Sequence, residues 1–565
     1  MKRIPYGISN FKVLREEDYL YVDKTSYIEL LDTYAPYQFF IRPRRFGKSL
    51  FISMLENYYD INKKNKFEEL FGDLYIGKNP TKNKNRFLVW KISFAGVDAG
   101  HGEEELRKSF NLKMTYAVKN FLEDYTNFFR DEQIPENVVN AETAVAYISY
   151  LSRKASIPVF VLIDEYDNFA NELITGGKQN TYKNILHGEG FVKVFYKALK
   201  DASADNFARI FMTGVSPIML DDLTSGFNIT MNYTLDENLN AMLGFTREEL
   251  SSIMDEVGLT DCDLRKKICK DMTEYYNGYK FNANSESVFN PDMAMYFLNR
   301  YLAYNRYPKE MIDNNVKTDY GRVNQLAYNF NDKEALKEIM STGETSTILV
   351  DRFNIQTMYS EKENFKSLLF YLGMLTIKEE GPLGTVLKIP NYVIKTIYWE
   401  QYFQKVNEDY NIEIQKVRVA VNEMRMYGSI EPLIEIVKGI LEDLSNRDLI
   451  QMDENNVKMM FITLLGVDST YFIKSEDENN KGYVDLMLRR KIQLKDITKF
   501  EWIIELKYIK ESDRNNLGKV RDQGLKQLQM YGKSKMVQDE LDKEGLKKVL
   551  IIVVGKKDIY TVNLS

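Results

Sequence analysis

The chain has 565 residues, a length that suits about three or four domains of roughly 100–200 residues each. Hydrophobic residues make up 44% and charged residues 28%, a composition that excludes wholesale disorder. No apolar run approaches the ~18–20 residues that cross a bilayer, and the first residues lack the apolar segment of a secretory signal. We therefore expect a cytoplasmic protein that uses no membrane.

The chain has only two cysteines and two histidines, which limits the kinds of metal site and catalysis that it can support. Cys262 and Cys269 lie on one side of a predicted helix, a pattern typical of buried thiols in a reducing compartment. Neither CxxC nor HxxxH spacing occurs, and His101 and His187 fall in predicted loops or element ends, so a zinc site is not indicated. Any catalysis should rest on carboxylates, lysines and a metal ion.

Charge is spread unevenly along the chain. The formal net charge is −6, which argues against a strongly basic nucleic-acid coat. Residues 481–565, however, contain 19 Lys and Arg against 12 Asp and Glu. This local excess suits a polyanionic partner, although an ordinary solvated surface would give the same count.

Residues 37–235 alternate between short apolar runs and helical patterns. The run at 158–163 (PVFVLI) is continuously apolar, as expected of a strand buried on both faces. This alternation predicts an α/β fold, a parallel sheet with helices on both faces. The predicted strands are 37–41, 87–94, 158–163, 208–212 and a weaker 228–235, and the predicted helices include 48–59 and 103–125.

Beyond residue 237 the pattern changes twice. It is mostly helical to about residue 449, with a capping box at Thr246 and Glu249 and a short strand or hairpin over 383–393. The remainder predicts a small α/β domain with strands at 482–488, 500–508 and 549–554 and a helix at 519–530. We therefore expect three domains, 1–237, 238–449 and 450–565.

A phosphate-binding loop is indicated after the first strand. The segment FFIRPRRFGKSLFISMLENYY places Gly47, Lys48 and Ser49 between a predicted strand and a predicted helix. In such a loop backbone N–H groups wrap the phosphates, and the helix N-terminus adds a favourable dipole. Lys48 would reach the β- and γ-phosphates, and Ser49 would ligate Mg²⁺. Arg42 replaces the first glycine of GxxxxGK[ST], and the arginines of this loop either add charge to the site or are simply solvated.

A second apolar strand supports the same prediction. The segment PVFVLIDEYD ends in Asp164, which would hold the Mg²⁺ shell, and Glu165, which would polarise the attacking water. The alternative is a buried strand that ends in a solvated acidic turn. The next strand ends in Thr213, which either senses the γ-phosphate or caps the strand, and Arg209 is an undistinguished arginine-finger candidate. The expected cofactor-binding residues are Arg42, Arg44, Arg45, Phe46, Gly47, Lys48, Ser49, Asp164 and Thr213.

The C-terminal region carries a second chemical pattern. In the strand EWIIELKYI, Glu505 and Lys507 point to the same face, and burying them is unfavourable unless they pair or bind a ligand. Asp485 lies on an earlier predicted strand, and two carboxylates that hold Mg²⁺ beside a lysine can hydrolyse phosphodiesters. The spacing D-x19-E-x-K is the PD-(D/E)xK nuclease signature, whereas a structural Glu–Lys pair is the alternative. Gln527 and Tyr531 lie on a following helix that can face the same site.

The order of motifs resembles a known family. The segments are YGISNFKVLREEDYLYVDKTSYIELL, RPRRFGKSL, LIDEYD, FMTGVSPI, LGFTREEL, YYNGYKF, VFNPDMAMYFL, LLFYLGMLTI, SEDENNKGYVDLML, IIELK and QLQMY. Over nearly the whole chain they look like the AAA-ATPase-like family of bacterial proteins, whose members commonly end in a PD-(D/E)xK nuclease-like domain. The family also has Arg where the first P-loop glycine is expected.

The resemblance implies two sites. One binds ATP and Mg²⁺ at Lys48, Ser49, Asp164 and Glu165. The other is nuclease-type, with Asp485, Glu505 and Lys507, and with Glu478 as an extra carboxylate. Two departures stand out: Gly482-Tyr483 replaces the Gly-Arg of many relatives, and NNVKMMFITLLGV has no Glu beyond Glu454 to supply an upstream carboxylate.

Three functional hypotheses follow. In the first, an ATPase acts with a Mg²⁺-dependent nuclease domain on DNA or RNA, with Glu165, Asp485, Glu505 and Lys507 as catalytic residues and Ser49, Asp164, Asp485 and Glu505 as metal ligands. In the second, which the missing upstream Glu favours, ATP controls a signalling or binding switch whose C-terminal domain binds a partner or nucleic acid without cutting. The third is a pseudo-ATPase scaffold. Nucleic acid is the expected partner, and a homo-oligomer is left open.

Overall fold

The chain folds into two compact units. The computed structural model describes residues 1–186, 190–218, 227–321, 333–353, 361–410, 412–443, 452–467, 470–475, 477–479, 482–542 and 544–564. The first unit comprises Met1–Ala303, Ile312–Leu336 and Glu344–Tyr392, and the second comprises Tyr304–Met311, Lys337–Gly343 and Val393–Ser565.

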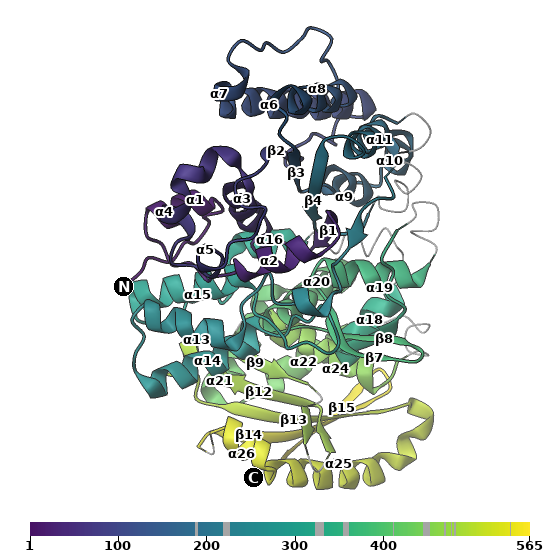
Figure 1. The fold of residues 1–565 in the computed structure, drawn as a ribbon. Helices are drawn as coiled ribbons and strands as arrows, with labels where there is room; N and C mark the ends of the chain where they lie inside the picture. The colour runs from purple at the N-terminus through teal and green to yellow at the C-terminus, as the bar shows by residue number, and fades with distance from the viewer. Residues whose placement is uncertain are drawn as a thin grey trace. The chain divides into compact units, whose positions relative to one another are not determined.

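A parallel sheet forms the centre of the first unit (Figure 1). Its strands, in spatial order, are β2 (Leu88–Ser93), β3 (Val159–Asp164), β4 (Phe207–Gly214), β1 (Tyr37–Ile41) and β5 (Met231–Asn232). Every neighbouring pair is parallel, and β3 is buried along its whole length. The predicted α/β fold is confirmed, with the fifth strand shorter than predicted.

Helices cover this sheet because their apolar stripes face it. The helix α3 (Lys48–Tyr59) packs against β2 and β3, whereas α11 (Phe191–Ser203) packs against β4. The sheet lies between these two helices in Figure 1. Two further helices, α6 (Glu103–Asp124) and α8 (Ala141–Ala155), pack against each other, and Asn140 and Thr143 form a capping box that begins α8.

The rest of the first unit is mostly helical. It includes α13 (Arg247–Glu256), α14 (Cys262–Tyr276), α15 (Pro291–Tyr304) and α19 (Lys362–Tyr371). The predicted capping box at Thr246 and Glu249 begins α13 with both hydrogen bonds present. The predicted hairpin near residue 383 is part of a three-stranded antiparallel sheet of β6 (Glu344–Thr347), β8 (Gly384–Lys388) and β7 (Thr376–Gly381).

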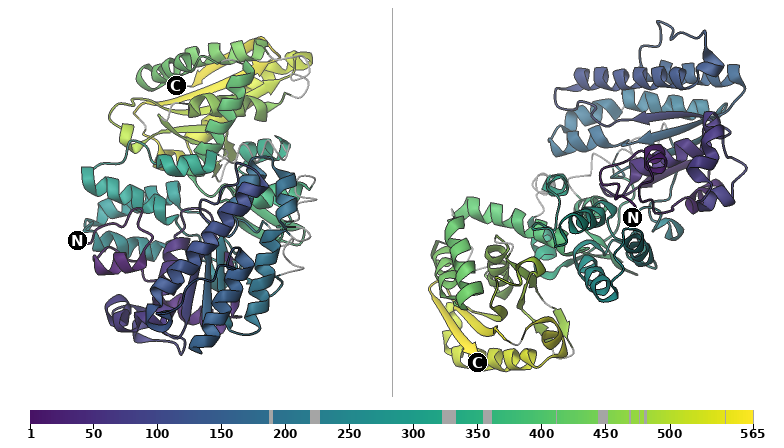
Figure 2. Two further views of the ribbon diagram at one scale, coloured as in Figure 1. Left: turned by 90° about the horizontal axis from the view of Figure 1, so that it is seen from above. Right: turned by 90° about the vertical axis from the view of Figure 1, so that its left-hand side faces the viewer.

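The second unit contains a mixed five-stranded sheet. Its order is β15 (Asp558–Leu564), β14 (Leu546–Val554), β13 (Glu501–Ile509), β12 (Leu486–Arg490) and β9 (Tyr471–Lys474), with only β13 and β14 parallel among these neighbours. The helix α25 (Leu517–Gly532) lies along one face of this sheet (Figure 2). The predicted strand over 482–488 is divided at Asp485 into β11 (Gly482–Val484) and β12, and β11 pairs with β10 (Asp477–Asn479).

The helical region predicted over 238–449 is shared between the two units. The helices α21 (Ile414–Tyr427), α22 (Glu431–Asp443) and α24 (Glu454–Gly466) pack against one another or against strands of the second unit. The apolar stripe of α22, which includes Leu433 and Val437, is buried there. The predicted limits at 237/238 and 449/450 therefore do not coincide with the division between the units, because helical periodicity does not reveal which core a helix joins.

The end of β4 generates a test of the fold of the first unit. The Asp167 carboxylate accepts hydrogen bonds from the backbone N–H groups of Val215 and Ser216, and a β-carbon at Gly214 would overlap Asp167 and the ring of Tyr166. We expect Gly214→Ala to destabilise the protein by about 1–3 kcal/mol, measured by calorimetric unfolding. The control is Gly439→Ala on α22, where the new methyl group meets no atom within 4 Å and should stabilise by about 0.5–1 kcal/mol. Equal melting temperatures for Gly214→Ala and the wild type would contradict the packing described.

Candidate functional site

The loop between β1 and α3 forms a cradle ahead of a helix N-terminus. Arg45 and Gly47 adopt left-handed backbone conformations, with φ of 69° and 86°. A β-carbon at Gly47 would meet no atom within 4 Å, so the space above the turn is open. Backbone N–H groups in such a turn, together with the start of α3, are suited to bind an anion such as a phosphate.

Lys48 is the first residue of α3, and its side chain folds back over this loop. Its ammonium group donates hydrogen bonds of 2.9 Å to the carbonyl oxygens of both Arg42 and Pro43. Burial lowers the pKa of Lys48 to about 8, although Asp164, Asp167 and Glu165 act in the opposite direction. An anion at the cradle would favour the charged form of this lysine.

Ser49 and Asp164 meet although 115 residues separate them in the chain. The Ser49 hydroxyl donates a 2.6 Å hydrogen bond to Asp164 Oδ2, which joins the first turn of α3 to the end of β3. Asp164 Oδ1 accepts a 2.9 Å hydrogen bond from the backbone N–H of Glu165. Glu165 has a left-handed φ of 51°, and burial, followed by the nearby Asp164, raises the pKa of its carboxyl group.

Thr213 lies between these groups because β4 lies between β1 and β3. It pairs with Phe40 of β1, and its hydroxyl is buried without a hydrogen-bond partner in the described part of the chain. Leaving a buried hydroxyl unpaired is unfavourable. A ligand at the end of this sheet would supply the partner.

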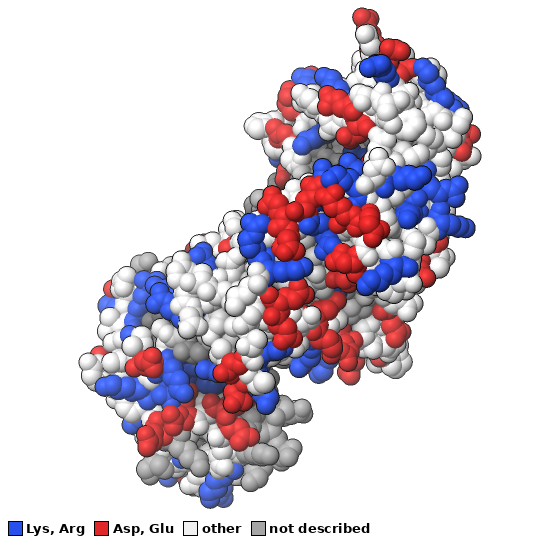
Figure 3. Space-filling model, turned by 60° about the vertical axis from the view of Figure 1, so that its left-hand side comes forward, with Lys and Arg blue, Asp and Glu red and all other residues white. Residues whose placement is uncertain are grey.

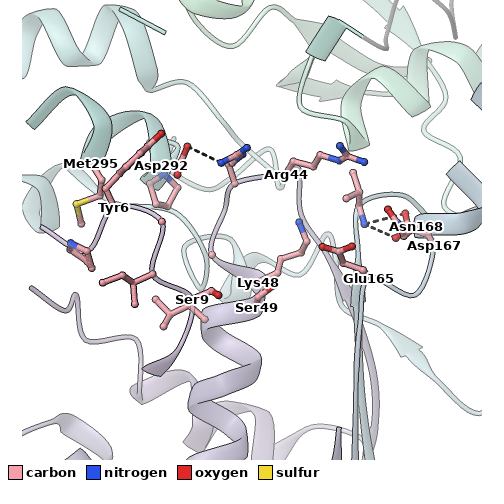
Figure 4. A pocket seen from close by; sticks show the side chains of 18 of the residues that line it. Tyr6, Ser9, Arg44, Lys48, Ser49, Glu165, Asp167, Asn168, Asp292 and Met295 are labelled. Carbon is pink, nitrogen blue, oxygen red and sulfur yellow. Dashed lines mark hydrogen bonds and ion pairs between the residues drawn. The ribbon is translucent and has the colours of Figure 1, made fainter. Parts of the chain in front are cut away.

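A pocket of about 640 Å³ opens over the loop, a volume usual for small-molecule sites. Figure 4 shows that Lys48, Ser49 and Glu165 face its central part, where they come from α3 and from the end of β3. Arg44 also lines the pocket, and Arg45 forms an ion pair with Asp292 of α15 over 3.7 Å. On the side away from Glu165 the lining includes Tyr6, Ser9 and Met295 (Figure 4).

A separate cluster occupies the second unit, around Lys507 on β13. The Lys507 ammonium lies 2.9 Å from Glu505 Oε1, 3.1 Å from Glu454 Oε1 and 3.9 Å from Asp485 Oδ2. Asp485 lies between the end of β11 and the start of β12, and its carboxylate also accepts a 2.8 Å hydrogen bond from the backbone N–H of Leu506. The three predicted residues are therefore brought together, with Glu454 in addition.

Burial determines the direction of the pKa shift of Glu505, but neighbouring charges determine that of Lys507. Glu505 is 1% exposed, and burial, followed by the nearby Asp485, raises its pKa to about 8. Burial disfavours the charged form of Lys507, yet Glu505 and Asp485 outweigh it and raise its pKa. Glu505 Oε2 is buried without a hydrogen-bond partner among the described residues. An unpaired buried carboxylate oxygen of this kind fits a cation as a ligand.

Two regions of the chain match models of known protein families. Residues 5–224 match the family model described as "Predicted AAA-ATPase", and residues 452–562 match that of the "PD-(D/E)XK nuclease superfamily". The chain carries an AAA-ATPase-like region followed by a PD-(D/E)XK nuclease-superfamily region. The suspected order of domains is thus confirmed.

Two individual proteins are similar to this chain. The "Uncharacterized protein in vnfD 5'region" of Azotobacter chroococcum mcd 1 is 27% identical over 409 residues, which cover 70% of this chain and 68% of that protein. The Walker-type ATPase PABY2304 of Pyrococcus abyssi aligns with 66% of this chain and 94% of its own, at 13% identity and a TM-score of 0.38. Within the described ranges, no helix has the length and apolarity needed to cross a membrane.

In the AAA-ATPase-like region the side chain of Arg42 does not have the predicted cofactor role. Its guanidinium is buried and donates to the carbonyl oxygens of Ile41, Thr234 and Leu239. The Phe46 ring likewise packs edge-on against Tyr279 and Phe281, so only the backbone of Phe46 is available to a phosphate.

Arg209 is excluded as an arginine finger of this chain's own pocket. It pairs with Asp32 over 3.3 Å and donates to the Leu31 carbonyl oxygen. It also lies near the start of β4, at the opposite end of this strand from Thr213.

In the nuclease-superfamily region Glu454, the one glutamate of the upstream helix, is the first residue of α24 and pairs with Lys507 over 3.1 Å. The Asp453 side chain caps α24 by accepting a hydrogen bond from the Asn456 N–H, which fixes Glu454 as the first residue of this helix but does not reveal its contact with Lys507. The side chain of Glu478 lies outside the described residues.

Two residues of α25 face the same cluster. Tyr531 is buried, and burial together with Glu505 and Asp485 raises its pKa to about 12, while Gln527 forms a hydrogen bond with it. Among the described residues no three Asp, Glu, His or Cys side chains lie close enough to form a ready-made metal site. Lys507 lies between the carboxylates instead.

The scarce residues have minor places in the structure. His101 is exposed and contacts Asp98 over 2.7 Å, whereas His187 lies outside the described residues. Cys269 is half-buried, but Cys262 is exposed because it begins α14 at the surface, so the expectation of two buried thiols is wrong for Cys262.

The raised pKa of Glu505 predicts how pH changes stability. In the folded chain Glu505 holds its proton to about pH 8, whereas an ordinary glutamate loses it near 4.5, so the folded state binds more protons between these values. The stability gained from the protonated form is complete below this window and is lost as pH rises through about 8. We therefore expect the unfolding free energy of Glu505→Gln, relative to wild type, to rise with pH across this window in urea denaturation.

The matched control is Glu544→Gln, which replaces an exposed carboxylate of the same unit. It should follow the wild-type pH dependence. Parallel curves for Glu505→Gln and wild type would contradict the shifted titration.

Proposed function

We propose that the first unit binds ATP with Mg²⁺ and hydrolyses it. The observation that carries this proposal is the 2.6 Å contact between Ser49 and Asp164 beside Lys48. A hydroxyl and a carboxylate at this spacing are the oxygen ligands that Mg²⁺ prefers when it accompanies a nucleotide. The open cradle at Gly47 and the unpaired hydroxyl of Thr213 fit the phosphates.

Each side chain then has a separate task. The Lys48 ammonium, which now donates to the Arg42 and Pro43 carbonyl oxygens, would donate to the β- and γ-phosphates instead, and Ser49 and Asp164 would hold the ion. Glu165, with its raised pKa, accepts a hydrogen bond from the attacking water and orients it. Bound Mg²⁺ supplies neutralisation of phosphate charge.

Replacing Lys48 and replacing Glu165 should separate ATP binding from ATP hydrolysis. We expect Lys48→Ala to weaken Mg·ATP binding at least about tenfold because the main phosphate contact is lost. Glu165→Gln should instead keep its affinity and lose about 10²–10⁴-fold in hydrolysis rate. Isothermal titration and phosphate release measure the two effects. Equal ATP affinity of the wild type and Lys48→Ala would contradict the proposal.

We further propose that the second unit is a nuclease-type domain that cleaves nucleic acid with Mg²⁺, and that ATP controls it. The convergence of Glu454, Asp485 and Glu505 on Lys507 supports the nuclease part of this proposal. Asp485 and Glu505 would hold the ion, and the unpaired Glu505 Oε2 fits a ligand role. Lys507 stabilises negative charge on the phosphate, and Glu454 keeps Lys507 directed toward the site. The bound ion would activate water.

Cleavage tests this second activity. We expect purified full-length protein to degrade DNA or RNA with Mg²⁺ or Mn²⁺, and Lys507→Ala to abolish cleavage because the charge that stabilises the phosphate is gone. The control is Lys510→Ala, which removes an exposed lysine just beyond the same strand. Cleavage assays with and without ATP show whether the nucleotide regulates the cleavage rate. Loss of cleavage in both variants, or in neither, would contradict the assignment.

A second candidate function is a nucleotide-controlled binding switch without cleavage. The observation that favours it is the absence, among described residues, of three metal-binding side chains in close reach. Under this alternative, wild type and the Asp485→Ala, Lys507→Ala double variant bind nucleic acid equally and neither turns it over.

Nucleic acid is the partner we propose, recognised at the site and not by a uniformly basic coat. Acidic and basic side chains are intermingled on the face drawn in Figure 3, in keeping with a net charge of −6. Cytoplasmic location stays a prediction.

A further inference from the structure

Arg42 occupies an unusual position for an arginine. It is 1% exposed, and its guanidinium lies between the rings of Phe40 and Phe281, 4.1 Å and 3.9 Å from their centroids. It donates hydrogen bonds of 2.7–3.0 Å to three carbonyl oxygens, those of Ile41, Thr234 and Leu239. No carboxylate pairs with it among the described residues, so a buried cation is held by dipoles and ring faces alone. Burying a charged group without a counter-charge costs folding free energy, so we expect Arg42 to have a role beyond packing.

The backbone of the same residue belongs to the phosphate cradle. Its carbonyl oxygen accepts one of the two hydrogen bonds from the Lys48 ammonium, at 2.9 Å. Its N–H donates to the Gly214 carbonyl oxygen at 3.3 Å, next to Thr213 on β4. Arg42 therefore touches the phosphate-binding lysine with its main chain and a different region with its side chain.

That different region begins the helical part of the first unit. Residues 234–239 lie in the segment between β5 and α13, and the next residue, Asn240, accepts a 2.9 Å hydrogen bond from the Phe281 N–H and donates one to the Glu286 carbonyl oxygen. Two of the three carbonyl groups that Arg42 holds, those of Thr234 and Leu239, and one of its two rings, that of Phe281, thus belong to one assembly. We call it the Arg42 clamp: Arg42, residues 234–240 and Phe281.

We propose that Arg42 is a positioning residue that links occupation of the phosphate site to the helical part of the first unit. The inference rests on the nucleotide binding proposed above. When phosphates draw the Lys48 ammonium from the Arg42 carbonyl oxygen, the backbone of Arg42 shifts. Because the planar guanidinium is bonded to the carbonyl oxygens of Thr234 and Leu239 and covered by the ring of Phe281, the shift passes to residues 234–240 and Phe281. A lysine has one compact charge and cannot keep this set of contacts.

Hydrogen exchange of the full chain tests the link. With saturating Mg²⁺ and a non-hydrolysable ATP analogue, we expect the exchange rates of the Leu239, Asn240 and Phe281 amides in wild type to change by about threefold or more. In Arg42→Lys the analogue should still bind, about tenfold more weakly, and these rates should no longer respond.

The matched control is Arg209→Lys. Arg209 is also buried, lies on β4 and bonds to a carbonyl oxygen, but it pairs with Asp32 and lies away from the phosphate cradle. This variant should lose stability yet keep both the affinity and the exchange response of wild type. A purely structural role of Arg42 would make the two variants behave alike.

The outcomes separate this inference from the proposed function. Binding of the analogue by wild type without a change at the Arg42 clamp overturns the link, as does a response that persists in Arg42→Lys. If Arg42→Lys does not fold, the wild-type measurement and Lys48→Ala, which should show no response, decide the question. If wild type binds neither ATP nor the analogue, the proposed nucleotide function itself fails.

Discussion

The geometry of the candidate site in the first unit depends on the hydrogen bond between Ser49 and Asp164. Strands β1, β4 and β3 are parallel neighbours, so their carboxyl ends reach one edge of the sheet. The helix α3 starts at this edge and presents its first turn to the end of β3. A change in strand order would separate the two side chains and leave a lysine, a hydroxyl and a carboxylate with no common ligand.

Two lysines, Lys48 buried and Lys507 half-buried, illustrate how surroundings decide the pKa of one functional group. Lys48 is held by two carbonyl oxygens and its pKa is lowered, because dipoles compensate only in part for the loss of water. Lys507 is surrounded by carboxylates and its pKa is raised. The first is ready to gain an anion, and the second already has its counter-charges. This contrast agrees with a site that captures phosphates and a site that must first take up a cation.

Much of the architecture could be predicted from local pattern. The helix after the phosphate-binding loop was predicted with its exact limits, Lys48–Tyr59, because Gly47 and the apolar spacing mark both its start and its stripe. The strand that ends at Asp164 was equally clear from its continuous apolar run. The pairing of Glu505 with Lys507 followed from the alternation of side chains along β13.

The features that were missed depend on contacts between distant parts of the chain. From the sequence, Arg42 is expected either to be solvated or to add charge to the phosphate site. Its contacts with Thr234, Leu239 and Phe281 could not be predicted because these residues are distant in the chain. Glu454 lies 53 residues from Lys507, and nothing local in α24 indicates their contact. The division of the helical region between two units could not be predicted for the same reason, because an apolar stripe on a helix does not show which core it packs against.

The ring of carboxylates around Lys507 also imposes an order of events. Three acidic side chains face a single ammonium, so the carboxylates outnumber it even when Glu505 is protonated. Under the proposed nuclease function, a phosphodiester that arrived alone would be repelled, and a divalent ion would have to enter before it or with it. The ion would then be needed for entry of the substrate as well as for its cleavage.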